Sequence, residues 1–196
     1  MKYFWLAAKD QRRNNFVFFQ EASASLPVEL RDTYADLQCP KCKKIDEIAA
    51  LQRGIEDGVH FVARQDFVQC CFGQIAASLR LRTILSEHNI RGVDFVDIPS
   101  NPNYAIVVPS TIAETDLGSC GVEFHRRCTT CGRFRETCFL PSISSITTPN
   151  DDLVIFSTSV RIESTRGAVQ WFLVSNTVKK ILLSEKVSGV EYMACS

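Results

Sequence analysis

Hydrophobic and polar positions along this chain repeat weakly at a separation of 97 residues. Each copy carries apolar residues at positions i, i+3 and i+4, which together form one face of an amphipathic helix. These positions are Leu81, Ile84 and Leu85 in the first copy and Val178, Ile181 and Leu182 in the second. In both copies a glycine then ends the helical region and an alternating segment follows, which predicts strands over 93–98 and 190–194.

The segments before the two helices are also apolar and predict a strand that enters each helix. These strands cover 66–71 and 171–174, so each half of the chain should contain a strand–helix–strand unit. A duplication explains this similarity, and a chance resemblance between two helix–turn–strand units is the alternative. Further strands are predicted over 2–6, 15–19, 104–108, 121–124 and 153–157, and a further helix is predicted over 43–55.

Segments rich in turn-forming residues divide these elements. Residues 99–103 predict a link between the two halves, and residues 142–152 predict a surface loop. We therefore expect an α+β fold built from two related halves, 1–99 and 100–196, each with a β-α-β unit. The two halves are expected to pack as one globular unit.

Composition excludes some classes of protein. Hydrophobic residues make up 45% of the 196 residues and charged residues 22%, the balance of a globular protein with a real core. The 22 basic and 22 acidic residues cancel, which argues against capture of nucleic acid or an anionic membrane by overall charge. No apolar run approaches the roughly 20 residues that span a bilayer, and no targeting segment is visible. We therefore expect a cytoplasmic protein with no membrane partner.

Cysteine is the residue type with the strongest chemical signal. The chain has nine cysteines, and in a reducing cytoplasm they are not expected to form a set of disulfides. Four of them form two Cys-x-x-Cys pairs with 85 residues between them, Cys39 with Cys42 and Cys128 with Cys131. Each pair turns two thiolates toward one point, and two such pairs supply the four soft ligands that Zn²⁺ prefers.

The expected zinc is structural, because four thiolates fill a tetrahedral coordination shell and leave no position for a reacting water. We therefore expect the metal to join the two halves of the chain and the protein not to be an enzyme. Cys120, His125 and Cys138 lie close enough to the second pair to replace one of its ligands. The cysteines outside the two pairs are otherwise expected to be small buried side chains.

Two other functions stay open. Cys39 and Cys42, followed by a predicted helix, resemble the active-site turn of glutaredoxins, which indicates a thiol–disulfide oxidoreductase. The polar segment 29–38 before this turn predicts no buried strand to present it. The Phe-His-Arg-Arg segment at 124–127 beside the second pair indicates a zinc-ribbon-like nucleic-acid-binding module, against which the neutral overall charge argues.

Motifs in a fixed order along the chain resemble those of the double-CXXCG motif family of bacterial proteins. These motifs are Met-Lys-Tyr-Phe-Trp-Leu at 1–6, Cys-Pro-Lys-Cys at 39–42, Cys-Thr-Thr-Cys-Gly-Arg at 128–133, Asp-Asp-Leu-Val-Ile-Phe at 151–156 and the unit at 173–192. The first pair is followed by Lys43, where the family has glycine. The resemblance implies that Cys39, Cys42, Cys128 and Cys131 are the metal ligands.

The same resemblance implies a function and a partner. Members of the family include immunity proteins that protect a cell from toxins exchanged between kin. We therefore expect a zinc-stabilised antitoxin that neutralises a cognate protein toxin by stoichiometric binding. Such inhibition depends on shape and charge complementarity over a surface patch and needs no reactive group.

Overall fold

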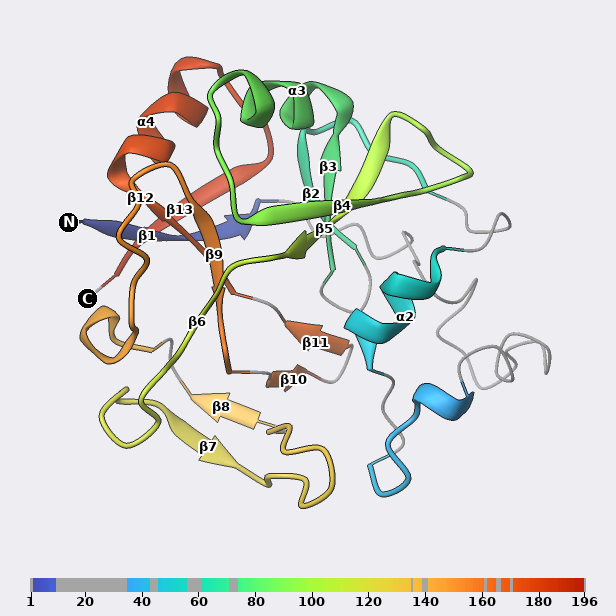
Figure 1. The fold of residues 1–196 in the computed structure, drawn as a ribbon, viewed down its shortest axis with the longest axis vertical. Helices are drawn as coiled ribbons and strands as arrows, with labels where there is room; N and C mark the ends of the chain where they lie inside the picture. The colour runs from blue at the N-terminus through green and yellow to red at the C-terminus, as the bar shows by residue number, and fades with distance from the viewer. Residues whose placement is uncertain are drawn as a thin grey trace.

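The structure of the protein, a computed structural model, describes residues 2–9, 35–42, 46–55, 61–70, 74–134, 136–138, 141–160, 162–164, 167–169 and 171–195. Strands outnumber helices among them (Figure 1). The helices are η1 (Ala35–Leu37), α2 (Glu47–Arg53), α3 (Leu79–Glu87), η3 (Ile143–Ser145) and α4 (Asn176–Ser184), where η marks a 3-10 helix. The strands are β1 (Tyr3–Ala8), β2 (Phe67–Gln69), β3 (Ile75–Ser78), β4 (Val93–Asp97), β5 (Tyr104–Pro109), β6 (Ile112–Ala113), β7 (Glu123–His125), β8 (Glu136–Cys138), β9 (Ile155–Thr158), β10 (Ile162–Ser164), β11 (Gly167–Val169), β12 (Phe172–Ser175) and β13 (Val190–Ala194).

Two sheets form the body of the protein. The larger has the strand order β13-β1-β12-β9-β6, and the smaller has the order β2-β3-β5-β4. Among the strands that the structure describes, β6 and β9 pair in parallel and all other neighbours are antiparallel. The hairpins β7–β8 and β10–β11 lie toward the opposite end of the molecule from α3 and α4 (Figure 1). The predicted α+β class is therefore confirmed.

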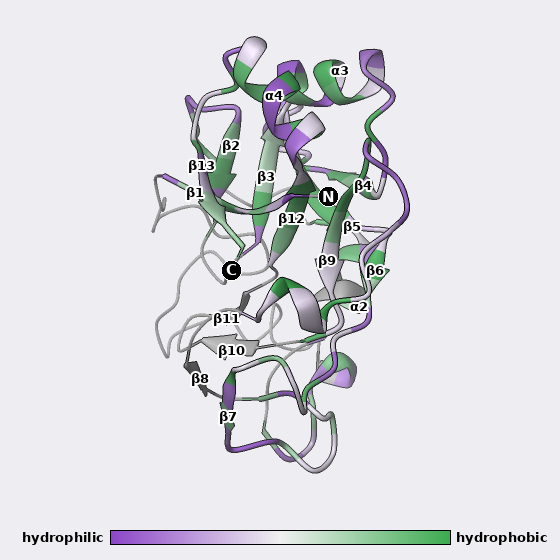
Figure 2. Ribbon diagram, turned by 90° about the vertical axis from the view of Figure 1, so that its left-hand side faces the viewer, coloured by the Kyte–Doolittle hydropathy of each residue, from purple (hydrophilic) through white to green (hydrophobic). Residues whose placement is uncertain are grey.

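The two sheets share one hydrophobic core. Along β1, Phe4 and Leu6 belong to this shared core, whereas Tyr3 and Trp5 belong to a second core on the other face of the larger sheet. Successive side chains of a strand point to opposite faces, so the continuous apolar run at the start of the chain fits a strand buried on both sides. Figure 2 shows the strongly hydrophobic strands lying inside, with α3 and α4 mixed in colour at one end.

The helices α3 and α4 cover one end of the shared core, as their apolar spacing predicts. Leu81, Ile84 and Leu85 of α3 and Val178 and Leu182 of α4 are buried. Each helix begins at a serine whose hydroxyl accepts a hydrogen bond from the backbone amide three residues later, Ser78 from Leu81 and Ser175 from Val178. Both helices have nine residues, the longest in the described part of the chain, and none there is long and apolar enough to cross a membrane.

The helix predicted over 43–55 is shorter in the structure. Its described part is α2, which begins after Asp46, where the carboxylate accepts a hydrogen bond from Ala49 N at 3.3 Å. The helix ends at Arg53 and is capped by Gly54, whose φ of 96° lies in the left-handed half of backbone space. Residues 43–45 lie outside the described residues, as does the strand predicted over 15–19.

The prediction that residues 66–71 form the strand entering the first helix is wrong. That strand is β3, and β2 lies one strand earlier and pairs with it in antiparallel fashion. Ala76, Ala77 and Ser78 conceal β3 in the sequence because small residues have weak strand propensity. Both alanines are fully buried between packed layers, where small side chains fit. The strands β6, β8, β10 and β11 were also not predicted.

The two sheets do not divide the chain where the two halves were predicted to meet. The strand β1 lies between β12 and β13 of the larger sheet, although it comes from the start of the chain. The strand β5, which follows residue 100, lies between β3 and β4 of the smaller sheet. Residues 99–103, predicted as a link between halves, form the turn that joins β4 to β5 within one sheet.

Candidate metal centre

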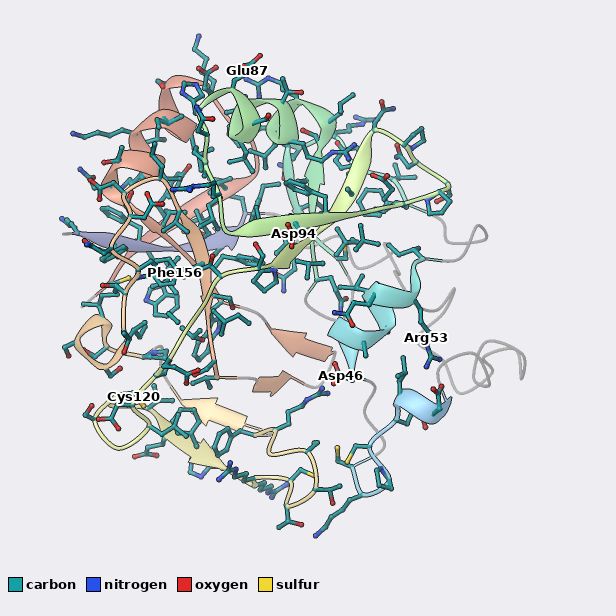
Figure 3. The ribbon with its side chains drawn as sticks, viewed as in Figure 1. Asp46, Arg53, Glu87, Asp94, Cys120 and Phe156 are labelled. Atoms are coloured by element: carbon teal, nitrogen blue, oxygen red, sulfur yellow. The ribbon has the colours of Figure 1, made fainter. Side chains whose placement is uncertain are left out.

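Four sulfur atoms come together at the end of the molecule opposite α3 and α4, where the η1 segment approaches the turn between β7 and β8 (Figure 3). The Sγ atoms of Cys39, Cys42, Cys128 and Cys131 all lie within 4.8 Å of one another. The Sγ atoms of Cys39 and Cys128 are 3.8 Å apart, and those of Cys42 and Cys131 are 3.7 Å apart. The predicted convergence of the two Cys-x-x-Cys pairs is therefore confirmed.

The spacing of these sulfur atoms fits a tetrahedral metal ion better than disulfides. A disulfide requires about 2.05 Å between its sulfur atoms, well below the sulfur–sulfur distances found in this cluster. A Zn–S bond of about 2.3 Å places the sulfur atoms of a tetrahedral site about 3.8 Å apart. The two distances of 3.8 and 3.7 Å match this value, so a divalent thiophilic ion fits with small adjustments of the side chains.

Backbone hydrogen bonds close the turn that carries the second pair. Gly132 N donates to Cys128 O at 2.9 Å, and Cys128 N donates to Arg133 O at 2.8 Å. Gly132 has a φ of 71°, which glycine adopts without the steric cost that a side chain would add. The turn connects β7 to β8, so the pairing of this hairpin fixes where Cys128 and Cys131 point.

Backbone amides and desolvation shift the thiol pKa values in opposite directions. Backbone amides of the second turn, that of Cys131 first, lower the pKa of Cys128 to about 6. In the first turn the Cys42 amide makes the largest contribution to lowering the pKa of Cys39. Desolvation raises the pKa of Cys131, and its sulfur contact with Cys128 adds to this effect. The site therefore favours thiolate at some positions and resists further negative charge at others, a conflict that a bound cation would remove.

Cationic side chains lie beside both cysteine turns. Lys41 Nζ donates to Thr129 Oγ1 at 2.8 Å and thereby connects the first turn to the second. Arg127 Nε donates to Gly132 O at 3.3 Å, and its guanidinium lies 5.5 Å from the centre of the Phe134 ring. Four thiolates carry more charge than one divalent ion supplies, so these cations would offset the excess. No sequence signal indicated the Lys41–Thr129 contact, because the two residues are 88 positions apart.

Cys120 and His125 do not join the cluster. Cys120 is buried, and its thiol donates to Leu117 O at 3.5 Å. The His125 ring lies 3.6 Å from a carboxylate oxygen of Glu123. The backbone of Cys138 pairs with β7, and its side chain lies outside what the structure describes.

Three cysteines outside the cluster can be compared with the expectation of small buried side chains. Cys70 and Cys120 are buried, in agreement with it. Cys195 is half-buried, and desolvation raises the pKa of its thiol to about 11. Cys71 lies outside the described residues.

The turn of the first pair differs from the arrangement expected of a glutaredoxin-like site. In such a site the helix begins at the reactive thiol, so that its N-terminus stabilises the thiolate. Here α2 begins at Glu47, after Cys42 and four further residues. The sulfur atoms of Cys39 and Cys42 each lie close to a sulfur atom of the second pair, at 3.8 and 3.7 Å. The geometry therefore supports one site shared by all four cysteines.

Comparisons with known proteins add no family assignment. No protein-family model matches the sequence, and no curated protein matches it either.

We expect the purified protein to bind one Zn²⁺ or Co²⁺ per chain, with the charge-transfer absorption of a cobalt tetrathiolate. Cys128→Ser should weaken metal binding by more than about 100-fold. Loss of a residue that only supports a ligand lowers metal affinity by roughly 10- to 100-fold, and this variant removes a ligand itself. Binding should also weaken as the pH falls through the pKa of Cys128, about 6, because protons compete with the metal for the thiolates. Metal analysis and cobalt titration measure both effects.

The matched control is Cys120→Ser, which removes a buried cysteine that does not belong to the cluster. This variant should keep the stoichiometry and the spectrum of the native protein. Equal metal content in the Cys128→Ser variant and the native chain would contradict the four-cysteine assignment.

Proposed function

We propose that this chain is a cytoplasmic bacterial immunity protein, stabilised by structural zinc, that neutralises a cognate toxin by direct stoichiometric binding. It would be built from two related α+β halves and would act without catalysis. The observation that carries the proposal is the convergence of Cys39, Cys42, Cys128 and Cys131. These residues belong to the two motifs by which the chain resembles the double-CXXCG family.

The chemistry of the cysteine set supports a structural rather than a catalytic role for the metal. Four thiolates complete the tetrahedral shell of zinc, and a catalytic zinc keeps one position for water or substrate. The metal would then order the two turns and the β7–β8 hairpin. A surface ordered in this way can bind a protein partner by complementarity, which is the mode of action expected of an immunity protein.

Co-expression tests the immunity function. The test pairs this chain with a candidate toxin from its genomic neighbourhood. The toxin should stop growth when produced alone, and growth should recover when this chain is produced with it. The two purified proteins should form a complex of fixed stoichiometry in size-exclusion chromatography. An unrelated toxin that kills equally well in the presence of the chain is the specificity control. If the neighbouring toxin also kills equally well, the proposed function is wrong.

A second candidate is a nucleic-acid-binding module formed by the β7–β8 hairpin. Arg126 and Arg127 are exposed there, and the Phe124 and Phe134 rings lie 4.5 Å apart beside them. Exposed cations next to aromatic rings are typical of surfaces that bind single-stranded nucleic acid. This function requires binding to RNA or DNA that weakens steeply with salt. Replacing Arg126 and Arg127 by glutamine should then reduce the salt dependence, whereas toxin neutralisation has no such requirement.

A further inference from the structure

Two long segments of the chain contain the same parts in the same order. The first runs from β1 through the Cys39–Cys42 turn, β2, β3 and α3 to β4. The second runs from β5 through the Cys128–Cys131 turn, β9, β12 and α4 to β13. Each bound of β12, α4 and β13 lies 97 residues after the matching bound of β3, α3 and β4. The first segment also holds η1 and α2, and the second holds η3, β6 and two hairpins, none of which has a counterpart among the described residues of the other segment.

Backbone hydrogen bonds recur at matching positions of the two segments. The bonds of the first segment are Leu79 N to Asn103 O, Ile98 N to Tyr104 O, Ile90 N to Leu85 O and Ser110 N to Gly92 O. Their counterparts in the second are Asn176 N to Lys2 O, Cys195 N to Tyr3 O, Val187 N to Leu182 O and Lys9 N to Gly189 O. This agreement extends beyond the helices to the ends of four strands, so it exceeds what two similar helix–turn–strand units require.

Unusual backbone conformations also recur. Asn89 and Lys186 each have a φ of 53°, and Gly92 and Gly189 have φ values of 92° and 84°. A positive φ is uncommon for residues other than glycine, and lysine is not among the types that favour it. The same rare conformation at matching positions therefore indicates that the two connections between helix and strand follow one path.

Strand pairing between the segments is reciprocal. In the smaller sheet β5, the first strand of the second segment, lies between β3 and β4 of the first. In the larger sheet β1, the first strand of the first segment, lies between β12 and β13 of the second. The registers agree: Ser78 is opposite Tyr104 as Ser175 is opposite Tyr3. We infer that the chain is a tandem repeat whose two copies have exchanged their first strands, so that the sheets and not the metal hold them together.

The exchanged strands lie in the interior of the sheets and not at their edges. Each pairs on both sides, so its removal would break two ladders of hydrogen bonds and expose apolar side chains. The four residues Tyr3, Phe4, Trp5 and Leu6 of β1 have at most 9% of their surface exposed, and Tyr104, Ala105, Ile106 and Val107 of β5 at most 8%. Neither copy can complete its own sheet without the other.

The cysteine site has the same two-copy symmetry but lies apart from the shared core. Cys39 contacts Cys128 and Cys42 contacts Cys131, so each cysteine meets its own counterpart in the other copy. The buried cysteines Cys39, Cys42 and Cys128 form a small cluster separate from the three larger cores. A metal held by all four cysteines would link the two copies, as expected, in addition to the sheets that already join them. Metal would order the cysteine end of a body that is already joined.

A cut between the two copies tests the inference in the full chain. A protease site inserted between the exposed residues Pro99 and Ser100 allows the folded protein to be cleaved after purification. The two fragments should elute together at the volume of the uncut protein, both with zinc and after removal of metal by a chelator. They should separate only in denaturant. A cut chain that also carries Cys39→Ser and Cys128→Ser should behave in the same way, without any chelator.

Hydrogen exchange of the uncut, metal-free protein gives a second measurement that does not depend on the insertion. Amides of β1 and β5 should keep protection within about tenfold of the metal-loaded protein, because their ladders do not involve the cysteines. Separation of the fragments on metal removal, or loss of this protection, would overturn the inference. Neither result depends on the identity of a toxin, so failure here is distinct from failure of the immunity function.

Discussion

Gly92→Ala and Gly189→Ala should each destabilise the protein by about 4 kcal/mol or more, enough to remove most of the stability of an ordinary domain. At Gly92 an added Cβ would lie 2.1 Å from Ile155 O, and at Gly189 it would lie 2.3 Å from Phe67 O. Both obstacles are backbone atoms, which cannot rotate away as the end of a side chain can. Each glycine also has a positive φ, so a side chain adds strain within its own residue.

The large effect follows from where these glycines lie. Arg91, next to Gly92, donates from its backbone N to Leu153 O and accepts at its backbone O from Ile155 N, at 2.9 and 2.8 Å. In the other copy Ser188 O accepts from Phe67 N at 3.1 Å. These bonds join the segment between α3 and β4 to β9 and the residues before it in the larger sheet. They also join the segment between α4 and β13 to β2 of the smaller sheet. A methyl group at either glycine would push the two sheets apart where their backbones meet.

The control is Gly121→Ala. Gly121 also has a positive φ, 69°, but an added Cβ would meet nothing within 4 Å. This variant should therefore lose only about 1 kcal/mol, the cost of the left-handed conformation alone. Urea denaturation of the three variants measures the free energy of unfolding and separates steric conflict from backbone strain. Equal stabilities for Gly92→Ala and Gly121→Ala would contradict the close approach of the two sheets.

The sequence was informative wherever one residue pattern had one physical explanation. The spacing of Leu81, Ile84 and Leu85 fixed a helix face because only a helix brings such positions together. The strand 190–194 was predicted with the bounds that the structure has, since alternation and a preceding glycine agree there. Two cysteine pairs in a chain that is expected to lie in a reducing compartment have few uses other than a metal, so their convergence could be predicted across 85 residues.

What the sequence could not provide is the partner of each strand. Apolar residues at 2–6 and 104–108 predict buried strands, but burial alone does not say which sheet buries them. Reciprocal exchange leaves the hydrophobic pattern of both copies unchanged, so a simple division at residue 99 and an exchanged fold look the same in sequence. The contact between Lys41 and Thr129 is hidden for the same reason, since it depends on the folded path and not on spacing.

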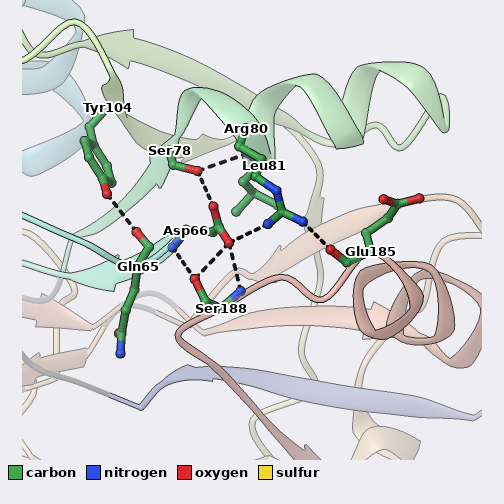
Figure 4. Close-up of polar contacts among 8 residues, drawn as sticks. All are labelled: Gln65, Asp66, Ser78, Arg80, Leu81, Tyr104, Glu185 and Ser188. Atoms are coloured by element: carbon green, nitrogen blue, oxygen red, sulfur yellow. Dashed lines mark hydrogen bonds and ion pairs between the residues drawn. The ribbon is translucent and has the colours of Figure 1, made fainter.

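Asp66→Asn should have the second large effect, a loss of about 3 kcal/mol at neutral pH. Asp66 is 8% exposed and accepts hydrogen bonds from Ser78 Oγ at 2.7 Å, Ser188 N at 2.9 Å and Ser188 Oγ at 2.8 Å (Figure 4). Arg80 Nη1 donates at 2.7 Å to Asp66 Oδ2, the oxygen that also accepts from Ser188, and Arg80 Nη2 donates to the Glu185 carbonyl. The carboxylate thus connects β2 and the N-cap of α3 to the segment before β13. Because Arg80 is half-exposed, most of the loss should come from the serine contacts.

The pH dependence of this loss identifies the charge as its cause. Burial favours the neutral acid, but the hydrogen bonds from Ser188 and Ser78 and the Arg80 charge outweigh it and lower the pKa of Asp66 below its ordinary value of 3.8. The unfolded chain therefore takes up this proton first as the pH falls. The stabilisation is complete above pH 3.8 and is lost as the pH falls through the lower pKa of the folded state. The stability difference between native protein and Asp66→Asn should accordingly shrink in acid.

Asp97→Asn is the matched control for this experiment. Asp97 also pairs with an arginine, Arg82, at 3.0 Å, but 80% of its side chain is exposed, so solvent screens the pair. Its removal should cost about 0.5 kcal/mol or less at either pH. Urea midpoints of both variants at neutral and acidic pH provide the comparison. If Asp66→Asn lowers the stability by the same amount at neutral and at acidic pH, then the shape of the side chain, and not its ionised carboxylate, holds the two copies together at that point.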